Sequence, residues 1–174
     1  MAGNTPIAYL SYGIAGKSFE SSVKDAMTQV KESLKNTWLL LDPARHGVSW
    51  LDKSLSEFVV HQDLHDIKRC DVVLAFFSSP SFGQSCEMWH AHHADKTVIV
   101  VSKGPPVYWS MWMYHTTDIW CSNVDAAIKL MDGVANMPLQ NKTKIMAITA
   151  KIEGAEPLTI STSMQHSEIH DFNT

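Results

Sequence analysis

Short apolar runs of strand length alternate with helix-length segments along most of this chain, and this alternation constrains its fold more than any other feature. The apolar runs cover residues 6–12, 37–43, 71–77 and 97–102. Three of them are apolar almost throughout, which is typical of strands buried on both faces of a parallel sheet. The helix-length segments cover residues 18–36, 54–67, 84–94 and 123–134. The pattern predicts an α/β fold in which a parallel sheet of about five strands is flanked by helices.

The chain has 174 residues, which fits one domain of ordinary size. The strand–helix alternation weakens after Gln140, so we place the main domain at residues 1–140 and a C-terminal extension at residues 141–174. Within the extension, residues 143–152 have the apolar content of one more strand, and the residues after them form a polar tail.

Composition and charge exclude several classes of function. Apolar residues make up 45% of the chain and charged residues 18%, as in a globular protein. The formal net charge of -4 argues against a nucleic acid polymer as partner. No apolar run is long enough to span a membrane, so we expect no membrane partner. Cys70, Cys86 and Cys121 fit neither a disulfide framework nor a zinc pattern, which favours a cytoplasmic protein without a metal.

The loop after the first apolar run has features of an anion site. In open parallel sheets, ligands bind outside the carboxyl ends of the strands. The sequence YLSYGIAGK, residues 9–17, carries Gly13 and Gly16 directly before the first helix. Backbone N–H groups, the helix N-terminus and Lys17 would attract an anion there, although a tight turn that needs glycine explains the same residues. The G-x-x-G spacing matches neither a dinucleotide fingerprint nor a Walker motif, so no cofactor is expected.

Three carboxylates near the predicted sheet are candidates for chemistry. Asp71 opens an apolar run, where a structural role as an anchor is favoured, and Asp63 is open to either interpretation. Glu87 is predicted in the first turn of a helix that begins near Gln84, where the helix dipole favours the ionised form. The alternative for Glu87 is a capping box, with Ser81 or Gly83 as the N-cap.

Three stretches together resemble the nucleoside 2-deoxyribosyltransferase superfamily: AYLSYGIAGK (8–17), HQDLHDIKRCDVVLAFF (61–77) and SPSFGQSCEMWHAH (79–92). The resemblance covers roughly residues 6–135 and depends on the order and spacing of Tyr9, Asp63, Asp71, Ser81, Gly83 and Glu87. Within the superfamily, residues 86–102 and 108–120 are most similar to nucleoside 5′-monophosphate N-glycosidases, the CMP and 5-hydroxymethyl-CMP hydrolases. The resemblance implies a Rossmann-like, flavodoxin-like sheet and a catalytic domain over residues 1–140.

The activity that the resemblance implies is hydrolysis of the N-glycosidic bond of a pyrimidine nucleoside 5′-monophosphate, which gives free base and (deoxy)ribose 5-phosphate. Glu87 would be the nucleophile or would stabilise the oxocarbenium ion, Tyr9 would orient Glu87, and Asp63 would contact the sugar and help the base to leave. The residues implied in substrate binding are Gly13, Ile14, Gly16, Lys17, Ser81, Gly83 and, from a neighbouring subunit of a homodimer or higher homo-oligomer with shared active sites, Ser110. The alternatives are a deoxyribosyltransferase that exchanges bases and a nucleotide-binding module without turnover.

The chain departs from the superfamily pattern at Gln84, which stands where relatives usually have Thr. Tyr12 and Ala15 also stand where relatives often have Gly and a basic or polar residue, so Lys17 or backbone amides would have to recognise a phosphate.

Three other motifs allow two interpretations each. The aromatic stretch VYWSMWMYH, residues 107–115, is typical of a subunit interface, and base stacking is the alternative. Phe19, Phe77 and Trp50 are further candidates for stacking on a base. The histidines of HAHH, residues 90–93, are interpreted as a surface cluster and not as metal ligands. Arg45 and His46 either touch the substrate or belong to a surface loop.

Overall fold

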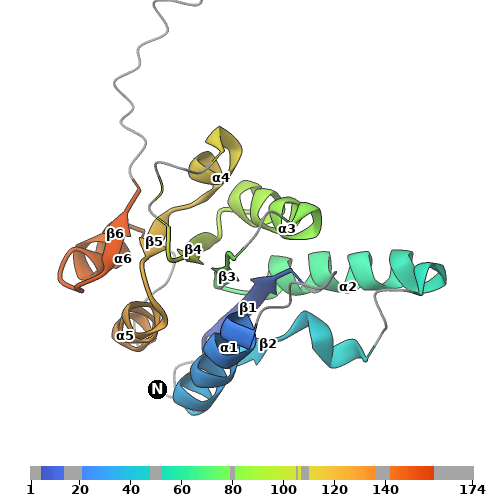
Figure 1. Ribbon diagram of the computed structural model, residues 1–174, viewed down its shortest axis with the longest axis horizontal. Coiled ribbons are helices and arrows are strands. Elements are labelled where there is room, and N and C mark those ends of the chain that lie inside the picture. Colours follow the sequence, from blue (N-terminus) through green and yellow to red (C-terminus); the bar gives the residue numbers. More distant parts are fainter. Residues whose placement is uncertain are drawn as a thin grey trace, which may run out of the picture.

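The protein has a six-stranded central sheet with the strand order β2-β1-β3-β4-β5-β6 (Figure 1). The computed structural model describes residues 5–13, 21–47, 52–78, 81–104, 106, 110–135 and 142–158. The strands are β1 (Ile7–Tyr12), β2 (Leu39–Leu41), β3 (Val72–Phe76), β4 (Thr97–Val101), β5 (Ile119–Cys121) and β6 (Ala155–Pro157). The first five pair in parallel, and β6 pairs antiparallel with β5. The predicted Rossmann-like fold is therefore confirmed, with the flavodoxin-like order of the first five strands.

Helices cover both faces of the sheet (Figure 1). The helices are α1 (Ser21–Leu34), α2 (Ser56–Arg69), α3 (Phe82–His93), α4 (Met111–Thr116), α5 (Val124–Val134) and α6 (Lys142–Thr149), with two short 3₁₀ helices, η1 (Pro43–His46) and η2 (Lys53–Leu55). Buried side chains of α1, α5 and α6 share one apolar core, and those of α2, α3 and α4 share the other. Among the described residues, no helix is both long and apolar enough to cross a membrane.

Strand β1 supplies side chains to both cores because successive side chains of a strand point to opposite faces. Ala8, Leu10 and Tyr12 belong to the core under α1 and α5, whereas Tyr9 belongs to the core under α2 and α3. Ser11 lies two residues after Tyr9, so its side chain shares the α2–α3 face. This alternation puts two hydroxyl groups on the face where α3 begins.

The C-terminal extension differs from its predicted structure. The prediction of a strand at residues 143–152 is wrong, because residues 142–149 form α6. Ile145 and Thr149 are both buried and lie four residues apart, which is the period of a helix. The fifth parallel strand is instead β5, which has three residues and lies beyond the aromatic stretch. Its length explains why the apolar pattern did not reveal it.

Two aspartates fix the starts of neighbouring strands at the edge of the sheet opposite the carboxyl ends. The carboxylate Oδ2 of Asp71, just before β3, accepts a hydrogen bond of 2.8 Å from the backbone N–H of Ile7 in β1. Asp118, just before β5, accepts one of 2.8 Å from the N–H of Val98 in β4. The structural role predicted for Asp71 is confirmed, and this aspartate lies at the far end of the strands from the candidate site.

Replacement of Asp71 tests this anchoring role. We expect Asp71→Ala to lower the free energy of unfolding by about 1–3 kcal/mol, because the Ile7 N–H loses a charged acceptor. Asp71→Asn keeps a side-chain oxygen and is expected to lose less than half as much. Urea denaturation of the three proteins measures the difference. Wild-type stability in Asp71→Ala would contradict the anchoring role.

Candidate active site

The candidate site lies at the carboxyl ends of β1 and β3, which are neighbours in the sheet. The chain leaves β1 toward α1 on one face of the sheet and leaves β3 toward α3 on the other face. Because the loops after β1 and β3 lead to opposite faces of the sheet, they diverge and leave a crevice at the sheet edge. Ligands bind in such a crevice in folds of this kind. Tyr9, Ser11 and the first turns of α3 all meet at this point.

Glu87 on α3 is held by two hydroxyl groups of β1. The Tyr9 hydroxyl donates a hydrogen bond of 3.2 Å to Oε1 of Glu87, and the Ser11 hydroxyl donates one of 2.5 Å to Oε2. Both carboxylate oxygens therefore have a donor, and the donors come from one face of one strand. Tyr9 is completely buried, whereas Glu87 keeps part of its surface exposed. The carboxylate thus has a fixed orientation and still reaches the sheet edge.

The start of α3 excludes the capping-box interpretation of Glu87. The N-cap is Ser81, whose hydroxyl accepts a 3.5 Å hydrogen bond from the backbone N–H of Gln84. Helix α3 begins at Phe82, so Glu87 lies in the second turn and not in the first turn as predicted. A capping box would need the glutamate three residues after the cap, and Gln84 occupies that position. The Glu87 carboxylate instead points to β1.

Asp63 on α2 lies close enough to influence both Tyr9 and Glu87. Burial raises the pKa of Tyr9 well above its ordinary value, and the charges of Glu87 and Asp63 and hydrogen bonds to them raise it further. A phenol has a single proton to donate, and here two carboxylates are within its reach. Tyr9 is therefore a neutral hydrogen-bond donor at every physiological pH and links the two acidic residues.

The pKa of Glu87 is raised from 4.5 to about 7. Burial is the largest cause, and the negative charge of Asp63 adds to it, whereas the hydrogen bonds from Ser11 and Tyr9 oppose the shift. Near neutral pH the side chain populates both its protonated and its ionised form. A carboxyl group in that state can exchange a proton or stabilise a positive charge at low cost.

A second polar network follows β2, beside the site. Tyr12 donates a 2.5 Å hydrogen bond to Oδ1 of Asp42, and Lys31 forms an ion pair with the same carboxylate. Burial alone would raise the pKa of Asp42, but the hydrogen bonds from Lys31, Tyr12 and the Ala44 N–H outweigh it and hold the pKa below its ordinary value. This network fixes the carboxyl end of β2 against β1 and α1.

Arg45 belongs to the same region and has a structural partner. Its guanidinium forms an ion pair with the buried carboxylate of Asp66 on α2 and donates a 2.8 Å hydrogen bond to the backbone oxygen of Asp42. Asp66 lies three residues after Asp63, on the same side of the helix. The structure thus supports a bridging role for Arg45 between η1 and α2. The backbone of His46 ends η1.

Part of the predicted phosphate site comes together in the structure. Gly13 lies directly against Ser81, since a Cβ atom built at Gly13 would be 3.4 Å from the Ser81 Cβ. The glycine loop after β1 and the N-cap of α3 are therefore adjacent. Gly83 is exposed in the first turn of α3, and a Cβ there would meet nothing within 4 Å. Ile14, Gly16 and Lys17, like Ala15, Phe19 and Trp50, lie outside the described residues.

Ser110 lies at the start of α4. It is exposed, and its hydroxyl caps the helix by accepting a 3.2 Å hydrogen bond from the Met113 N–H. Ser110 also lines a cavity of about 560 Å³ next to α3, which Phe77 and Gln84 line as well. The structure therefore brings Tyr9, Asp63, Glu87, Gly13, Ser81 and Gly83 to one edge of the sheet, and it places Ser110 in a cavity on α3.

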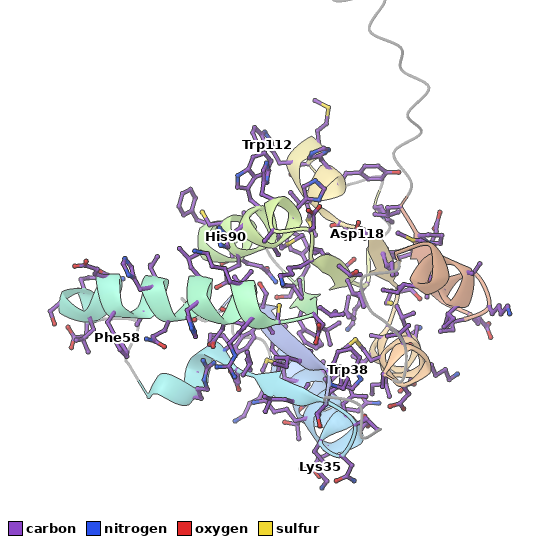
Figure 2. All side chains as sticks on the ribbon, turned by 180° about the vertical axis from the view of Figure 1, so that it is seen from behind. Lys35, Trp38, Phe58, His90, Trp112 and Asp118 are labelled. Carbon is purple, nitrogen blue, oxygen red and sulfur yellow. The ribbon has the colours of Figure 1, made fainter. Side chains whose placement is uncertain are left out.

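Two histidines of residues 90–93, His92 and His93, belong to an aromatic cluster with Trp89 and helix α4. The ring centroids of Trp89 and His93 are 3.8 Å apart, and those of Trp89 and Trp112 are 5.1 Å apart. Figure 2 shows Trp112 above α3 at the outside of the molecule, and 70% of its surface is exposed. Within the part of the chain that the structure describes, no group of three or more His, Cys, Asp or Glu side chains could hold a metal ion.

Ser11 is the functional candidate that the sequence analysis missed. It makes the shortest hydrogen bond to Glu87, although serine in an apolar run carries no signal by itself. The signal that could have revealed it is the two-residue spacing from Tyr9, which puts both side chains on one face of the strand. A polar residue on that otherwise buried face needs a partner, and Glu87 is that partner.

Comparisons with known proteins support this fold. No protein-family model and no curated protein match the chain. Among solved structures, a 2-deoxyribosyltransferase from Bacillus psychrosaccharolyticus matches with a TM-score of 0.57 and 16% identity over 70% of this chain and 90% of that chain. The CMP N-glycosidase BcmB from Clostridium botulinum matches with a TM-score of 0.48 and 17% identity over 72% and 98% of the two chains. The match to the 2-deoxyribosyltransferase shows that the two chains share a fold.

Replacement of Glu87 by glutamine tests the raised pKa. Between pH 4.5 and about 7 the folded protein keeps a proton on Glu87 that the unfolded chain has released. The wild type therefore loses stability as the pH rises through this window, by up to about 3 kcal/mol above pH 7. Glu87→Gln cannot ionise and escapes this loss.

Urea denaturation of both proteins at pH 4 and pH 8 measures the effect. We expect Glu87→Gln to gain stability over the wild type at pH 8 relative to pH 4. The same pH dependence in the two proteins would contradict a raised pKa for Glu87.

Proposed function

We propose that this protein hydrolyses the N-glycosidic bond of a pyrimidine nucleoside 5′-monophosphate and releases the free base and a (deoxy)ribose 5-phosphate. The observation that carries the proposal is the Glu87 carboxylate, which the hydroxyls of Tyr9 and Ser11 hold at the carboxyl ends of β1 and β3. The spacing of Tyr9, Asp63, Ser81, Gly83 and Glu87 resembles that of the nucleoside 2-deoxyribosyltransferase superfamily. Residues 86–102 and 108–120, which are most similar to nucleotide N-glycosidases, support hydrolysis within it.

The chemistry needs a negative charge beside the anomeric carbon. As the bond between that carbon and the base nitrogen breaks, the sugar gains the character of an oxocarbenium ion, and its electrons leave with the base. Ionised Glu87 would stabilise this charge or attack the anomeric carbon directly. Water then supplies the hydroxyl group of the sugar phosphate, and the base takes up a proton.

Tyr9 and Asp63 have supporting roles in the proposal. Tyr9 holds one oxygen of Glu87 and leaves the carboxylate oriented for the sugar. Asp63 would contact the sugar hydroxyls and would pass a proton from the attacking water to the leaving base. The charge of Asp63 also helps to keep the pKa of Glu87 near 7, which matches that carboxyl group to a reaction at neutral pH.

The phosphate of the substrate would lie where Gly13 meets Ser81. The N-terminus of α3 begins there and carries a partial positive charge. In the proposal, Ile14, Gly16 and Lys17 would complete the phosphate-binding loop, and Gly83 would offer a backbone N–H in the first turn of α3. The side chain of Lys17 would supply the positive charge that a basic residue at position 15 provides in relatives, where this chain has Ala15.

Two other functions compete with this one. A 2-deoxyribosyltransferase would use the same Glu87 but would pass the sugar to a second base instead of water. Incubation with nucleotides in the presence and absence of a free second base separates these reactions by their products. Exchanged nucleoside without sugar phosphate would replace our proposal with transfer. Binding without any product would indicate a nucleotide-binding module, although such a module has no need of a carboxyl group with a raised pKa.

A homodimer with shared sites is part of the proposal, with Ser110 of one subunit completing the phosphate site of the other. Apolar side chains at the α3–α4 surface support it, because Met111 and Phe82 are each 87% exposed and Trp112 is 70% exposed. Exposed aromatic side chains gathered on one surface are typical of interfaces. The proposed compartment is the cytoplasm, where the buried thiols of Cys70 and Cys121 would stay reduced.

Removal of the Glu87 carboxylate tests the assignment of the reaction. We expect Glu87→Ala to lower the rate of base release at least about 100-fold, because comparable electrostatic deletions cost roughly 3 kcal/mol. Asp71→Asn, at the opposite end of the strands, is the matched control and is expected to keep its activity. Near-wild-type turnover in Glu87→Ala would refute the role of this carboxylate.

A charge at the α3–α4 surface tests the dimer. We expect Trp112→Glu to be monomeric in light scattering and to release base more slowly, since Ser110 would no longer reach the neighbouring site. Phe58→Glu on α2 is the control, because Phe58 is also exposed, at 49%, but lies on another surface. A monomeric wild type, or an unchanged molar mass in Trp112→Glu, would contradict the proposed interface.

A further inference from the structure

Gln84 joins the carboxyl ends of the two strands that frame the site. It lies in the first turn of α3, and only 3% of its surface is exposed. Its side-chain Nε2 donates one hydrogen bond of 3.0 Å to the backbone oxygen of Ser11 in β1 and another of 3.0 Å to that of Phe76 in β3. Both acceptors are carbonyl oxygens, so only the NH₂ end of the amide can face them.

The bridge formed by Gln84 leads directly to Glu87. Ser11, whose carbonyl accepts from Gln84, donates its hydroxyl to Oε2 of Glu87 at 2.5 Å. Gln84 and Glu87 are three residues apart on the same helix, so they lie one turn from each other. Gln84, Ser11 and Glu87 therefore form a chain of hydrogen bonds that runs from α3 to β1 and back to α3.

We propose that Gln84 is a positioning residue that holds the Ser11 hydroxyl against the reacting carboxylate of Glu87. This inference rests on the function proposed above, in which Glu87 acts on the sugar. It also explains why the chain departs from the usual Thr at this position. A threonine hydroxyl has one proton and cannot donate to the carbonyls of both Ser11 and Phe76.

The cost of burying Gln84 argues against a purely packing role. Its Oε1 is buried and accepts no hydrogen bond from the part of the chain that the structure describes. An apolar side chain of the same length would fill the space without that penalty. The presence of a buried amide is therefore explained by its two N–H groups, which bind the carbonyl oxygens at the ends of β1 and β3 and so hold the strand that carries Ser11.

The test measures the titration of Glu87 without substrate. The chain is labelled with ¹³C at the glutamate carboxyl carbon, and Glu87→Gln identifies the signal of Glu87. The wild-type signal is expected to titrate with a pKa of about 7. Gln84→Met keeps the length of the side chain but has no donor. It is expected to raise the pKa of Glu87 by roughly 0.5–1, because the Ser11 hydrogen bond that lowers this pKa is weakened.

A double-mutant cycle shows whether Gln84 acts through Ser11. We expect Ser11→Ala to raise the pKa of Glu87 at least as much as Gln84→Met, and the double variant to match Ser11→Ala alone. Val30→Ala, in the core on the other face of the sheet, is the control for general loosening. It is expected to lower the melting temperature and leave the pKa of Glu87 unchanged. An unchanged pKa in Gln84→Met, or additive shifts in the double variant, would overturn the inference.

A measurement on the wild type covers the case in which Gln84→Met does not fold. Both side-chain amide protons of Gln84 are expected to exchange slowly with solvent in ¹⁵N NMR spectra, because each is in a buried hydrogen bond. Rapid exchange of either proton would overturn the inference. These experiments need no turnover, so they separate the two proposals. If the pKa of Glu87 in the double variant matches that in Ser11→Ala but no nucleotide releases its base, the proposed function is refuted and the role of Gln84 stands. If base is released but the two pKa shifts add in the double variant, the role of Gln84 is refuted and the proposed function stands.

Discussion

The attachment of the Glu87 carboxylate to β1 is the interaction on which the rest of the site depends. Burial destabilises the ionised form of a carboxyl group. The hydrogen bonds that the hydroxyls of Tyr9 and Ser11 donate to Glu87, at 3.2 and 2.5 Å, offset part of this cost. Both donors come from one strand face, so the geometry survives only while β1, β3 and α3 keep their relative positions. Asp71 fixes β1 to β3 at one end of these strands, and Gln84 fixes them at the other.

Most of the fold could be predicted from the sequence because its central strands are apolar on both faces. Strands β3 and β4 are completely buried, and such runs identify a parallel sheet without further information. Strand β5 and helix α6 could not be predicted in the same way. The apolar run of β5 is only Ile119–Cys121, between Asp118 and Ser122, and such a short run does not identify a strand, whereas β2 lies in a longer predicted run, residues 37–43. The apolar residues of 143–152 fit the period of a strand as well as that of a helix. The helix forms because its apolar side packs against α5.

The candidate site was predictable in part. The motif spacing identified Tyr9, Asp63 and Glu87, and the structure brings these side chains together. The position of Glu87 in the second turn depends on where α3 begins, and a sequence pattern does not fix a helix start to one residue. Ser11 could have been found from its two-residue spacing from Tyr9. The role of Gln84 depends on the pairing of β1 with β3, which are far apart in the sequence, and no local pattern contains that pairing.

A crystal structure of the Glu87→Gln variant with a bound pyrimidine nucleoside 5′-monophosphate tests the central claim most directly. The account predicts that the anomeric carbon of the sugar lies about 3–3.5 Å from the side-chain oxygen of residue 87. It also predicts that the phosphate lies beside the contact of Gly13 with Ser81, at the N-terminus of α3. A nucleotide bound with its sugar far from residue 87, or elsewhere on the protein, would contradict the assignment of Glu87 as the reacting carboxylate.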